Sequence, residues 1–323
     1  MTNPSLSVVI CAFTEDRWDD LRVAVESVRT QSRAALEIVV VVDHNPQLIR
    51  RVRGQLPDVV AVENKEPQGL SGARNTGIAA TQGAVVAFLD DDAIAEPDWL
   101  AQLLTGYADP LVCGVGGAIE PAWSVRRPGW LPAEFDWVIG CTYRGMPTQV
   151  GPVRNLIGAN MSFRREVFNA VGGFRSGMGR VGARPLGCEE TEFCIRARQR
   201  WPQKTLLYDP RARVRHRVPA RRARWTYFCA RCYAEGLSKA QVSGFVGARD
   251  GLASERLYTL RILPSGVVRG LRDSLSGDLS GLGRAGAIMA GLSVTSAGYA
   301  VGKIAKNIAV WKQGTPRRPA SEA

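Results

Sequence analysis

The stretch Ala84-Val85-Val86-Ala87-Phe88-Leu89-Asp90-Asp91-Asp92 decides the fold. Its apolar first part is short and rich in β-branched side chains, which is typical of a buried strand in a parallel sheet. Three adjacent carboxylates at the end of such a strand repel one another unless a cation shares their charge. Ligands of open α/β sheets bind outside the carboxyl ends of the strands, so the stretch indicates a divalent metal that holds a ligand's phosphates. The alternative is a solvated acidic turn in which Asp92 caps the next helix.

Further strand and helix patterns precede this stretch. Apolar runs at residues 6–13, 37–42 and 59–62 indicate strands, and Asp43 directly follows the second of them. A glycine-rich segment at residues 69–77 is typical of a loop that leads into a helix. This alternation predicts an α/β fold with a right-handed, mostly parallel sheet flanked by helices. The strand ends and the glycine-rich loop would then converge on one crevice.

Several segments resemble the nucleotide-sugar glycosyltransferases of family 2, which have the Rossmann-like GT-A fold. In the first half of the chain these are residues 7–10, 37–43, 72–77 and 88–92. In the second half they are residues 158–165, 171–174 and 188–196. The order and spacing of these segments hold from about residue 5 to about residue 218. The resemblance implies a GT-A domain that transfers a sugar from a nucleotide-sugar donor.

The chain also departs from the usual family pattern. Asp43 is followed by His44-Asn45-Pro46 in place of a second acid and a Ser/Asp turn, and Thr14 stands where the family usually has Asn. The usual Glu-Asp before the catalytic helix is Glu189-Glu190. Three segments, at residues 11–18, 42–46 and 189–196, resemble a subgroup named as glucuronosyltransferases acting on glucosyl lipid phosphates. That subgroup implies UDP-glucuronate as a candidate donor.

The charge of the chain is unevenly distributed. Residues 1–120 carry a net charge of −8 and residues 121–323 a net charge of +20. A basic half could bind nucleic acid, a phosphorylated acceptor or an anionic membrane, and no nucleic-acid-binding motif accompanies it, so nucleic acid ranks last. The seven cysteines are scattered and no leader segment is visible at the start of the chain, so we expect a reduced, cytoplasmic setting.

The residues after Val218 have a different pattern. Val267, Leu271 and Leu275 recur at helical spacing, which suits an amphipathic helix on the core or in a membrane interface. Residues 285–302 carry no charge and reach the minimum length of a membrane span, but they are rich in small residues, which favours an interfacial or core-packed hairpin. Basic residues follow, so we expect a peripheral protein on the cytoplasmic face of the cell membrane.

We therefore divide the chain into four parts. Residues 1–120 form the nucleotide-sugar-binding part of the GT-A domain and residues 121–220 its acceptor and catalytic part. Residues 221–312 form a helical extension that associates with the membrane, and residues 313–323 form a disordered tail.

The resemblance implies a metal site at the acidic stretch. Asp92 would bind the metal directly, and Asp90 or Asp91 would bind the ribose or a water of the metal. His216 is either a further metal or diphosphate ligand or a surface histidine within a basic cluster. Oxygen ligands favour Mg²⁺ or Mn²⁺.

The same resemblance implies a donor site. Asp43 would accept the N3–H of uracil, unless it is only a turn carboxylate, and Ala12 and Thr14 would border the base and ribose. Arg74 would pair with the diphosphate or orient Asp90. Gly72 would let the backbone approach the nucleotide, and Asn75 would cap the following helix.

Glu190 aligns with the general base of the family, and Glu189 is the rival candidate. Asn160 and Trp137 would line the acceptor side. Three functions remain open. The first is an inverting transferase from a UDP-sugar to a lipid-phosphate-linked saccharide, and the second is the same class acting on a soluble or polysaccharide acceptor or with another nucleotide. The third is a non-catalytic nucleotide- or carbohydrate-binding protein.

Overall fold

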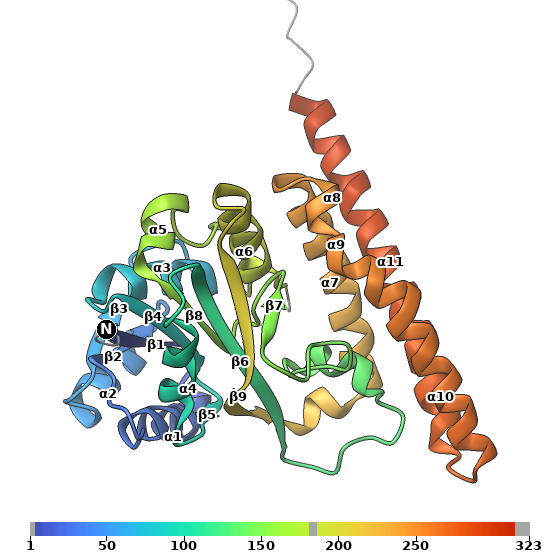
Figure 1. Ribbon diagram of the computed structural model, residues 1–323, viewed down its shortest axis with the longest axis horizontal. Coiled ribbons are helices and arrows are strands. Elements are labelled where there is room, and N and C mark those ends of the chain that lie inside the picture. The colour runs from blue at the N-terminus through green and yellow to red at the C-terminus, as the bar shows by residue number, and fades with distance from the viewer. Residues whose placement is uncertain (1–3, 181–185, 314–323) are drawn as a thin grey trace, which may run out of the picture.

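The computed structural model describes residues 4–180 and 186–313, without the side chains of residues 253 and 306–313. A nine-stranded sheet forms its centre, with the order β3-β2-β1-β4-β8-β6-β9-β5 and with β7 paired to β9 (Figure 1). The strands are β1 (Leu6–Ala12), β2 (Glu37–Val42), β3 (Val60–Glu63), β4 (Val85–Asp90), β5 (Ala93–Ala95), β6 (Val112–Trp123), β7 (Gly151–Val153), β8 (Asn160–Arg164) and β9 (Thr205–Val218).

The first four strands are parallel to one another, as the alternation of strands and helices predicted. The second half of the sheet is mixed, because β8 runs antiparallel to both β4 and β6. The short strand β5 pairs antiparallel with β9, so that Ala93 lies opposite His216. This pairing brings the far end of β9 beside the acidic turn that follows β4.

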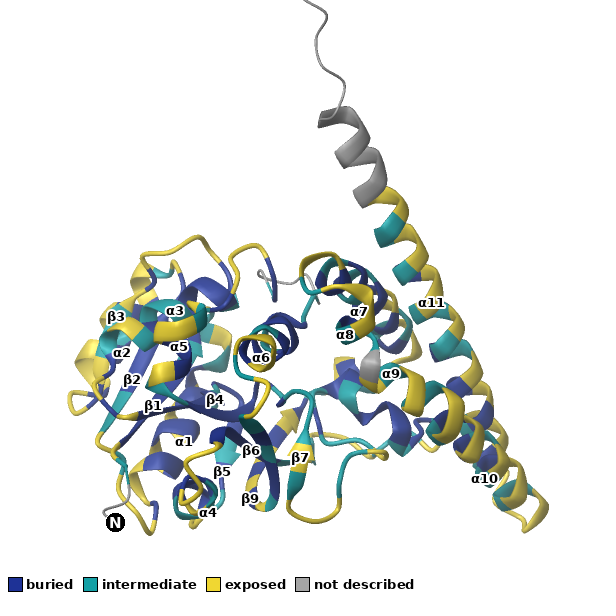
Figure 2. Ribbon diagram, turned by 45° about the horizontal axis from the view of Figure 1, so that its top comes forward, coloured by how far each residue is buried: buried dark blue, intermediate teal, exposed yellow. Residues whose placement is uncertain are grey.

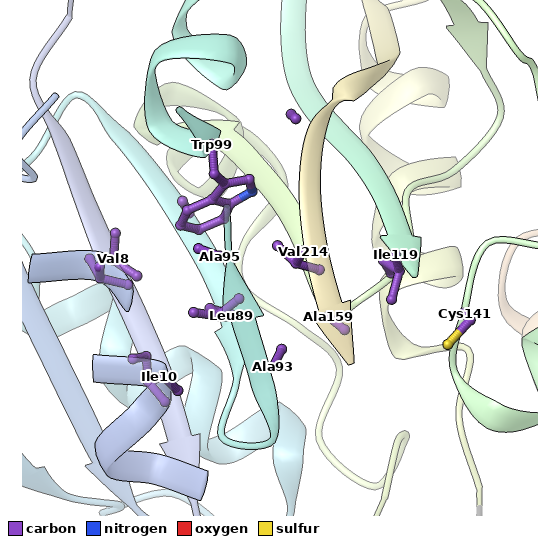
Figure 3. Packing of buried hydrophobic residues seen from close by; sticks show 14 of the residues in the cluster. Val8, Ile10, Leu89, Ala93, Ala95, Trp99, Ile119, Cys141, Ala159 and Val214 are labelled. Carbon is purple, nitrogen blue, oxygen red and sulfur yellow. The ribbon is translucent and has the colours of Figure 1, made fainter. Parts of the chain in front are cut away.

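Helices cover both faces of the sheet. Val8 and Ile10 of β1 pack with one set of helices, whereas Val9 between them packs with the other set on the opposite face. Figure 2 shows the buried strands between helices whose outer sides are exposed, and Figure 3 shows Leu89, Ala95 and Val214 packed beside Trp99. The helices of this domain are α1 (Trp18–Arg29), α2 (Pro46–Gln55), α3 (Leu70–Ala80), α4 (Trp99–Gly106), α5 (Arg165–Val171) and α6 (Glu189–Arg200).

The glycine-rich segment is a helix, so its prediction as a loop was wrong. Helix α3 already begins at Leu70, after Gly69 at φ 130°. Asn75 therefore lies inside α3 and does not cap a helix. Its side-chain amide instead donates to the carbonyl of Phe174 over 2.8 Å and accepts from the Phe174 N–H over 2.7 Å. The low helix propensity of glycine is overcome here by tertiary packing, since a Cβ on Gly77 would lie 2.5 Å from Val9.

The C-terminal part is a set of helices that packs on the GT-A-like domain beside η2 (Ala133–Ile139). Helix α11 lies along α7, and small residues allow their close approach. A Cβ on Gly236 of α7 would lie 2.1 Å from the carbonyl oxygen of Thr295, and one on Gly298 of α11 would lie 2.2 Å from the carbonyl oxygen of Tyr233. The helices are α7 (Trp225–Phe245), α8 (Ala248–Gly251), α9 (Ala253–Leu257), the π-helix η4 (Tyr258–Ile262), α10 (Leu263–Leu275) and α11 (Ser280–Gln313).

Helices α10 and α11 form a hairpin at the side of the molecule (Figure 1). Leu263, Gly266 and Gly270 of α10 are buried, whereas Leu271 and Leu275 on another side are 44% and 91% exposed. Within the described residues, Ser280–Ala305 is long and apolar enough to cross a membrane, and 28% of an apolar 18-residue stretch within it is buried inside the protein. Core helices of soluble proteins can have the same length and apolar composition. Most of the predicted disordered tail, residues 314–323, lies outside the described residues.

Candidate active site

A cavity of about 160 Å³ lies at the carboxyl ends of β1, β2 and β4. Ala12, Asp43 and Asp90 line it from these three strand ends, and Glu189 and Glu190 line it from the start of α6. The predicted convergence of strand ends on one crevice is therefore present. The cavity also holds Asp91, Asp92, Arg74, Trp137 and His216.

The three aspartates occupy different environments. Asp91 is buried and accepts a hydrogen bond from Nη1 of Arg17 over 2.7 Å, while its second oxygen has no hydrogen-bond partner among the residues that the structure describes. Burial and the charge of Asp92 raise the pKa of Asp91 to about 7. Asp90 is more open, and its Oδ1 lies 3.7 Å from Nη2 of Arg74. The stretch is thus an ion-paired acidic cluster and not a solvated turn.

Asp90, Asp92 and His216 can hold a metal ion. One ligand atom from each lies within 4.8 Å of the others. Oδ1 of Asp92 is 3.1 Å from Nε2 of His216, which suits two adjacent ligands of one ion, because ligands about 2.1 Å from an octahedral centre lie about 3 Å apart. The two carboxylates are hard oxygen ligands that suit Mg²⁺ or Mn²⁺, and the imidazole adds one nitrogen donor. The antiparallel pairing of β5 with β9 therefore makes His216 part of this cluster.

Cations surround Asp92 as well. Nη1 of Arg17 and Nη2 of Arg222 lie 3.2 and 3.6 Å from its Oδ2. Burial raises the pKa of Asp92, but His216 and the two arginines outweigh this effect and hold the pKa well below its usual range. Asp92 is therefore ionised. Its Oδ1 faces His216, and its Oδ2 faces Arg17 and Arg222.

Arg74 and Glu189 form a buried ion pair. Nη1 of Arg74 lies 2.7 Å from Oε1 of Glu189, and Nη2 donates to the carbonyl of Gly158 over 3.2 Å. Arg74 is only 2% exposed, so it is placed to orient Asp90 and Glu189 and has little freedom to follow a diphosphate. Of its two predicted roles, this geometry favours the orientation of Asp90 over a pairing with the diphosphate.

Glu190 differs from Glu189. Within the described residues its side chain has no ion-pair partner, and it lines both this cavity and a second one. Burial and the charge of Glu189 raise the pKa of Glu190 to about 8. Cys188, immediately before α6, has a left-handed conformation with φ 69°, and its thiol donates to Oε1 of Glu235 over 3.3 Å. A carboxyl group that binds its proton near neutral pH is suited to general-base chemistry.

The predicted donor residues are held in different ways. The carboxylate of Asp43 accepts from Asn64 Nδ2 over 2.6 Å and from the Gly69 N–H over 3.0 Å, which fixes it at the end of β2. Thr14 lines a neighbouring cleft, where its hydroxyl accepts from the Asp16 N–H over 3.3 Å. These placements suit a base between β1 and β2, with its ribose towards Asp90.

Two predicted residues lie away from the cavity. A Cβ on Gly72 would lie 2.2 Å from the carbonyl oxygen of Pro67, so this glycine permits close packing within the protein and not an approach to a nucleotide. Asn160 is fully buried and bonds to Trp99 and to the carbonyls of Ala118 and Ala212. It therefore fixes strands below the cavity, and the expected contact with an acceptor is not supported. Trp137 does line the cavity.

The sequence comparisons identify the family. Residues 7–172 match the model of glycosyl transferase family 2. The chain belongs to glycosyltransferase family 2. Over 238 residues it is 38% identical to the glucosyl-dolichyl phosphate glucuronosyltransferase of Haloferax volcanii, covering 72% of this chain and 76% of that protein. It is 23% identical over 298 residues to the succinoglycan biosynthesis protein ExoM of Rhizobium meliloti, covering 82% of this chain and 92% of that protein.

Solved structures confirm the GT-A-like fold of this family 2 glycosyltransferase. The mannosyltransferase PcManGT of Pyrobaculum calidifontis, in complex with GDP-Man and Mn²⁺, matches with a TM-score of 0.57 and 16% identity over 92% of this chain and 88% of that one. GalNAc-T7 with UDP, GalNAc and Mn²⁺ matches with a TM-score of 0.52 and 17% identity over 81% of this chain and 57% of that one.

The family 2 glycosyltransferase site also contains arginines that the sequence motifs did not single out. Arg17, Arg180 and Arg222 line the cavity. Arg180 has no ion pair among the described residues, and burial together with the charge of Arg222 lowers its pKa. The only sequence feature that pointed to Arg222 was its place in the basic cluster at residues 211–224. These cations fit the diphosphate of a nucleotide sugar.

Proposed function

We propose that this protein is an inverting transferase that moves a sugar from a UDP-sugar to a hydroxyl of a saccharide linked to a lipid phosphate. UDP-glucuronate is the proposed donor, because the Haloferax relative is named a glucuronosyltransferase that acts on glucosyl-dolichyl phosphate. The observation that carries the proposal is one cavity that joins the Asp90, Asp92 and His216 cluster to Arg180 and Glu190.

The leaving group is stabilised by charge in this proposal. Mg²⁺ or Mn²⁺ held by Asp90, Asp92 and His216 would act as a Lewis acid on the diphosphate. Arg180 and Arg222 add fixed positive charge to the same cavity, and cations that are already in place stabilise the charge that develops on the leaving group. Asp43 accepts the uracil N3–H at the end of β2, and Ala12 borders the base.

Glu190 supplies the general base. It takes the proton of the acceptor hydroxyl while that oxygen attacks the anomeric carbon, and the bond from this carbon to the diphosphate breaks. Attack from the face opposite the leaving group inverts the configuration. Glu189 is neutralised by Arg74 at 2.7 Å, so the neighbouring carboxyl group is the better proton acceptor.

Helix α10 supports a peripheral position on a membrane. Pro264, Val268, Leu271 and Leu275 are exposed, and their spacing places them within about 60° of the helix circumference. Arg261 and Arg272 are exposed near this stripe and suit anionic headgroups. The side of α10 that carries Gly266 and Gly270 packs on the protein, so the exposed leucines are free to enter the interface.

Nucleotide binding tests the donor part of the proposal. UDP with Mn²⁺ should raise the unfolding temperature, since a ligand at 100 times its dissociation constant adds about 2.7 kcal/mol of stability. CDP with Mn²⁺ should have a smaller effect, because N3 of cytosine carries no hydrogen and cannot donate to Asp43. Equal shifts from the two nucleotides would contradict the role of Asp43, and no shift from either would contradict the donor class.

A further inference from the structure

A second cavity lies on the other side of Glu190. It has a volume of about 360 Å³, and Trp137, Gly140, Ile157, Glu190 and Arg231 line both it and the candidate donor cavity. The remaining walls come largely from the C-terminal helices α7, α9, α10 and α11 and from η4. A group bound there would meet the carboxyl group of Glu190 from the side opposite the nucleotide.

One wall of this cavity is aromatic and held in place. The π-helix η4 carries Tyr258, whose hydroxyl accepts from Nε1 of Trp137 over 3.1 Å and donates to the carbonyl of Glu134 over 2.6 Å. Tyr143 packs edge-on against Tyr258 with ring centroids 5.6 Å apart. Rings fixed in this way form a preformed surface for the apolar face of a sugar. A π-helix turn of this kind is frequent at functional sites.

The opposite wall carries an ionic cluster. Arg154 and Lys239 both pair with Glu255, and Arg231 and Lys239 lie 2.9 and 3.2 Å from Glu235. Apart from Glu190 on the wall shared with the donor cavity, the three cations exceed the two carboxylates by one charge. One positive charge in excess suits one phosphodiester anion, because charge-assisted hydrogen bonds to the phosphate neutralise it away from water.

The rim of the cavity adjoins exposed apolar residues. Tyr258 and Thr259 face the cavity, whereas Leu257 and Leu260 beside them in the chain are 55% and 75% exposed. Ser254 of α9 and Ser296 of α11 are exposed and line the cavity, so the cavity reaches the surface at these helices, next to η4. A chain leaving the cavity there meets leucines that continue onto the exposed stripe of α10.

We propose that this second cavity, the acceptor chamber, binds a sugar joined through a phosphodiester to a lipid. The sugar lies on Trp137 and Tyr258 with one hydroxyl at Glu190, and the phosphate lies at Arg154, Arg231 and Lys239. The lipid leaves past Leu257 and Leu260 towards the membrane. This inference rests on the proposed transferase function and adds the part of the molecule that selects the acceptor.

The test uses the full chain with three probes, measured by calorimetry without donor. Glucosyl-phosphoryl-citronellol carries sugar, phosphate and a short lipid, octyl β-glucoside lacks the phosphate, and glucose 1-phosphate lacks the lipid. The first probe should bind at least ten times more tightly than the other two. Equal binding of octyl β-glucoside would overturn the phosphate site, and equal binding of glucose 1-phosphate would overturn the lipid path.

Ser296→Trp places an indole in the opening of the chamber, and Ser293→Trp on the same helix is the control, because Ser293 is exposed but does not line the chamber. Ser296→Trp should weaken binding of glucosyl-phosphoryl-citronellol at least tenfold, and Ser293→Trp should not change it. Both variants should bind UDP with Mn²⁺ as the wild type does. Unchanged probe binding in Ser296→Trp would overturn the chamber.

Lys239→Gln tests the ionic cluster, with Lys239→Arg as the charge-preserving variant. Lys239→Gln should remove the preference for the phosphate probe over octyl β-glucoside, and Lys239→Arg should keep it. A retained preference in Lys239→Gln would overturn the assignment of the phosphate to this cluster. Failure of the wild type to bind UDP would contradict the transferase function instead, since probe binding is measured without nucleotide.

Discussion

Nη1 of Arg74 lies 2.7 Å from Oε1 of Glu189, and both side chains are almost fully buried. The pair joins α3, the centre of the glycine-rich motif, to the first residue of α6. It fixes the start of the helix that carries Glu190 and neutralises the neighbouring acid. Two adjacent glutamates thus acquire different properties, one as half of an ion pair and the other as a carboxyl group open to both cavities.

Glu190→Gln should lower turnover by about two to four powers of ten, the usual contribution of a general base. Binding of UDP with Mn²⁺ should remain unchanged, because the amide keeps the shape of the side chain. Steady-state transfer rates and calorimetry measure the two effects. Full activity in this variant would show that another group accepts the proton.

Glu189→Gln should act mainly on stability. It leaves the guanidinium of Arg74 buried beside a neutral amide, and loss of one partner of a buried pair costs about 3–5 kcal/mol. Chemical denaturation of the two variants should therefore show a large loss of unfolding free energy for Glu189→Gln and none for Glu190→Gln. The reverse order would contradict the roles given to the two glutamates.

The pKa of Glu190, raised to about 8, gives a pH dependence. The base must be deprotonated, so kcat/KM should rise with pH up to about 8 and then level off. Stability should change in the opposite direction. Between the ordinary pKa of 4.5 and the folded pKa of about 8, Glu190 holds a proton in the native state that it has lost in the unfolded state. The free energy of unfolding therefore falls as the pH rises through this window. Thermal unfolding of Glu190→Gln should lack this component. An identical pH profile in wild type and variant would argue against a raised pKa.

His216→Ala should remove the dependence of UDP binding on Mn²⁺, because it removes one of three donors of the candidate metal cluster. His44→Ala is the control, since His44 is the other histidine of the chain and contacts Asp43 outside that cluster. Titration of Mn²⁺ at fixed UDP measures the effect. A metal response kept by His216→Ala and lost by His44→Ala would place the metal elsewhere.

Leu271→Asp combined with Leu275→Asp should weaken binding to anionic vesicles at least tenfold, because burial of one leucine contributes about 1.5–3 kcal/mol. Leu36→Asp combined with Leu111→Asp is the matched control, since these leucines are about half exposed and lie in the GT-A-like domain. Higher salt should weaken vesicle binding of the wild type, because the Debye length falls from about 10 Å at 0.1 M to about 3 Å at 1 M. If both double variants bind vesicles like the wild type, the stripe on α10 is not the docking surface.

The sequence was sufficient to predict the first half of the sheet and the acidic cluster, because β1, β2 and β4 are nearly all apolar and end at polar candidate site residues. It could not show that His216 lies opposite Ala93, since that contact depends on an antiparallel pairing between segments far apart in the chain. Arg180 stands in no recognisable pattern, and only the folded cavity shows it beside Arg222.

Motif positions also did not reveal the direction of side chains. Asn160 lies in a family segment, yet in the structure it points to Trp99 and the backbone of neighbouring strands. Gly72 lies in the glycine-rich motif and packs on Pro67. The small residues of α11 argued against a membrane span, and in the structure they allow close contact with α7. Hydropathy alone does not identify this packing partner.

The most direct test is the configuration of the product. The full chain should be incubated with UDP-glucuronate, Mn²⁺ and glucosyl-phosphoryl-citronellol, and the new linkage assigned by NMR. Because the donor sugar is α-linked to UDP and Glu190 activates the acceptor for attack from the opposite face, we predict release of UDP and a β-linked glucuronosyl product. An α-linked product, or UDP release with no new glycosidic bond, would contradict the account.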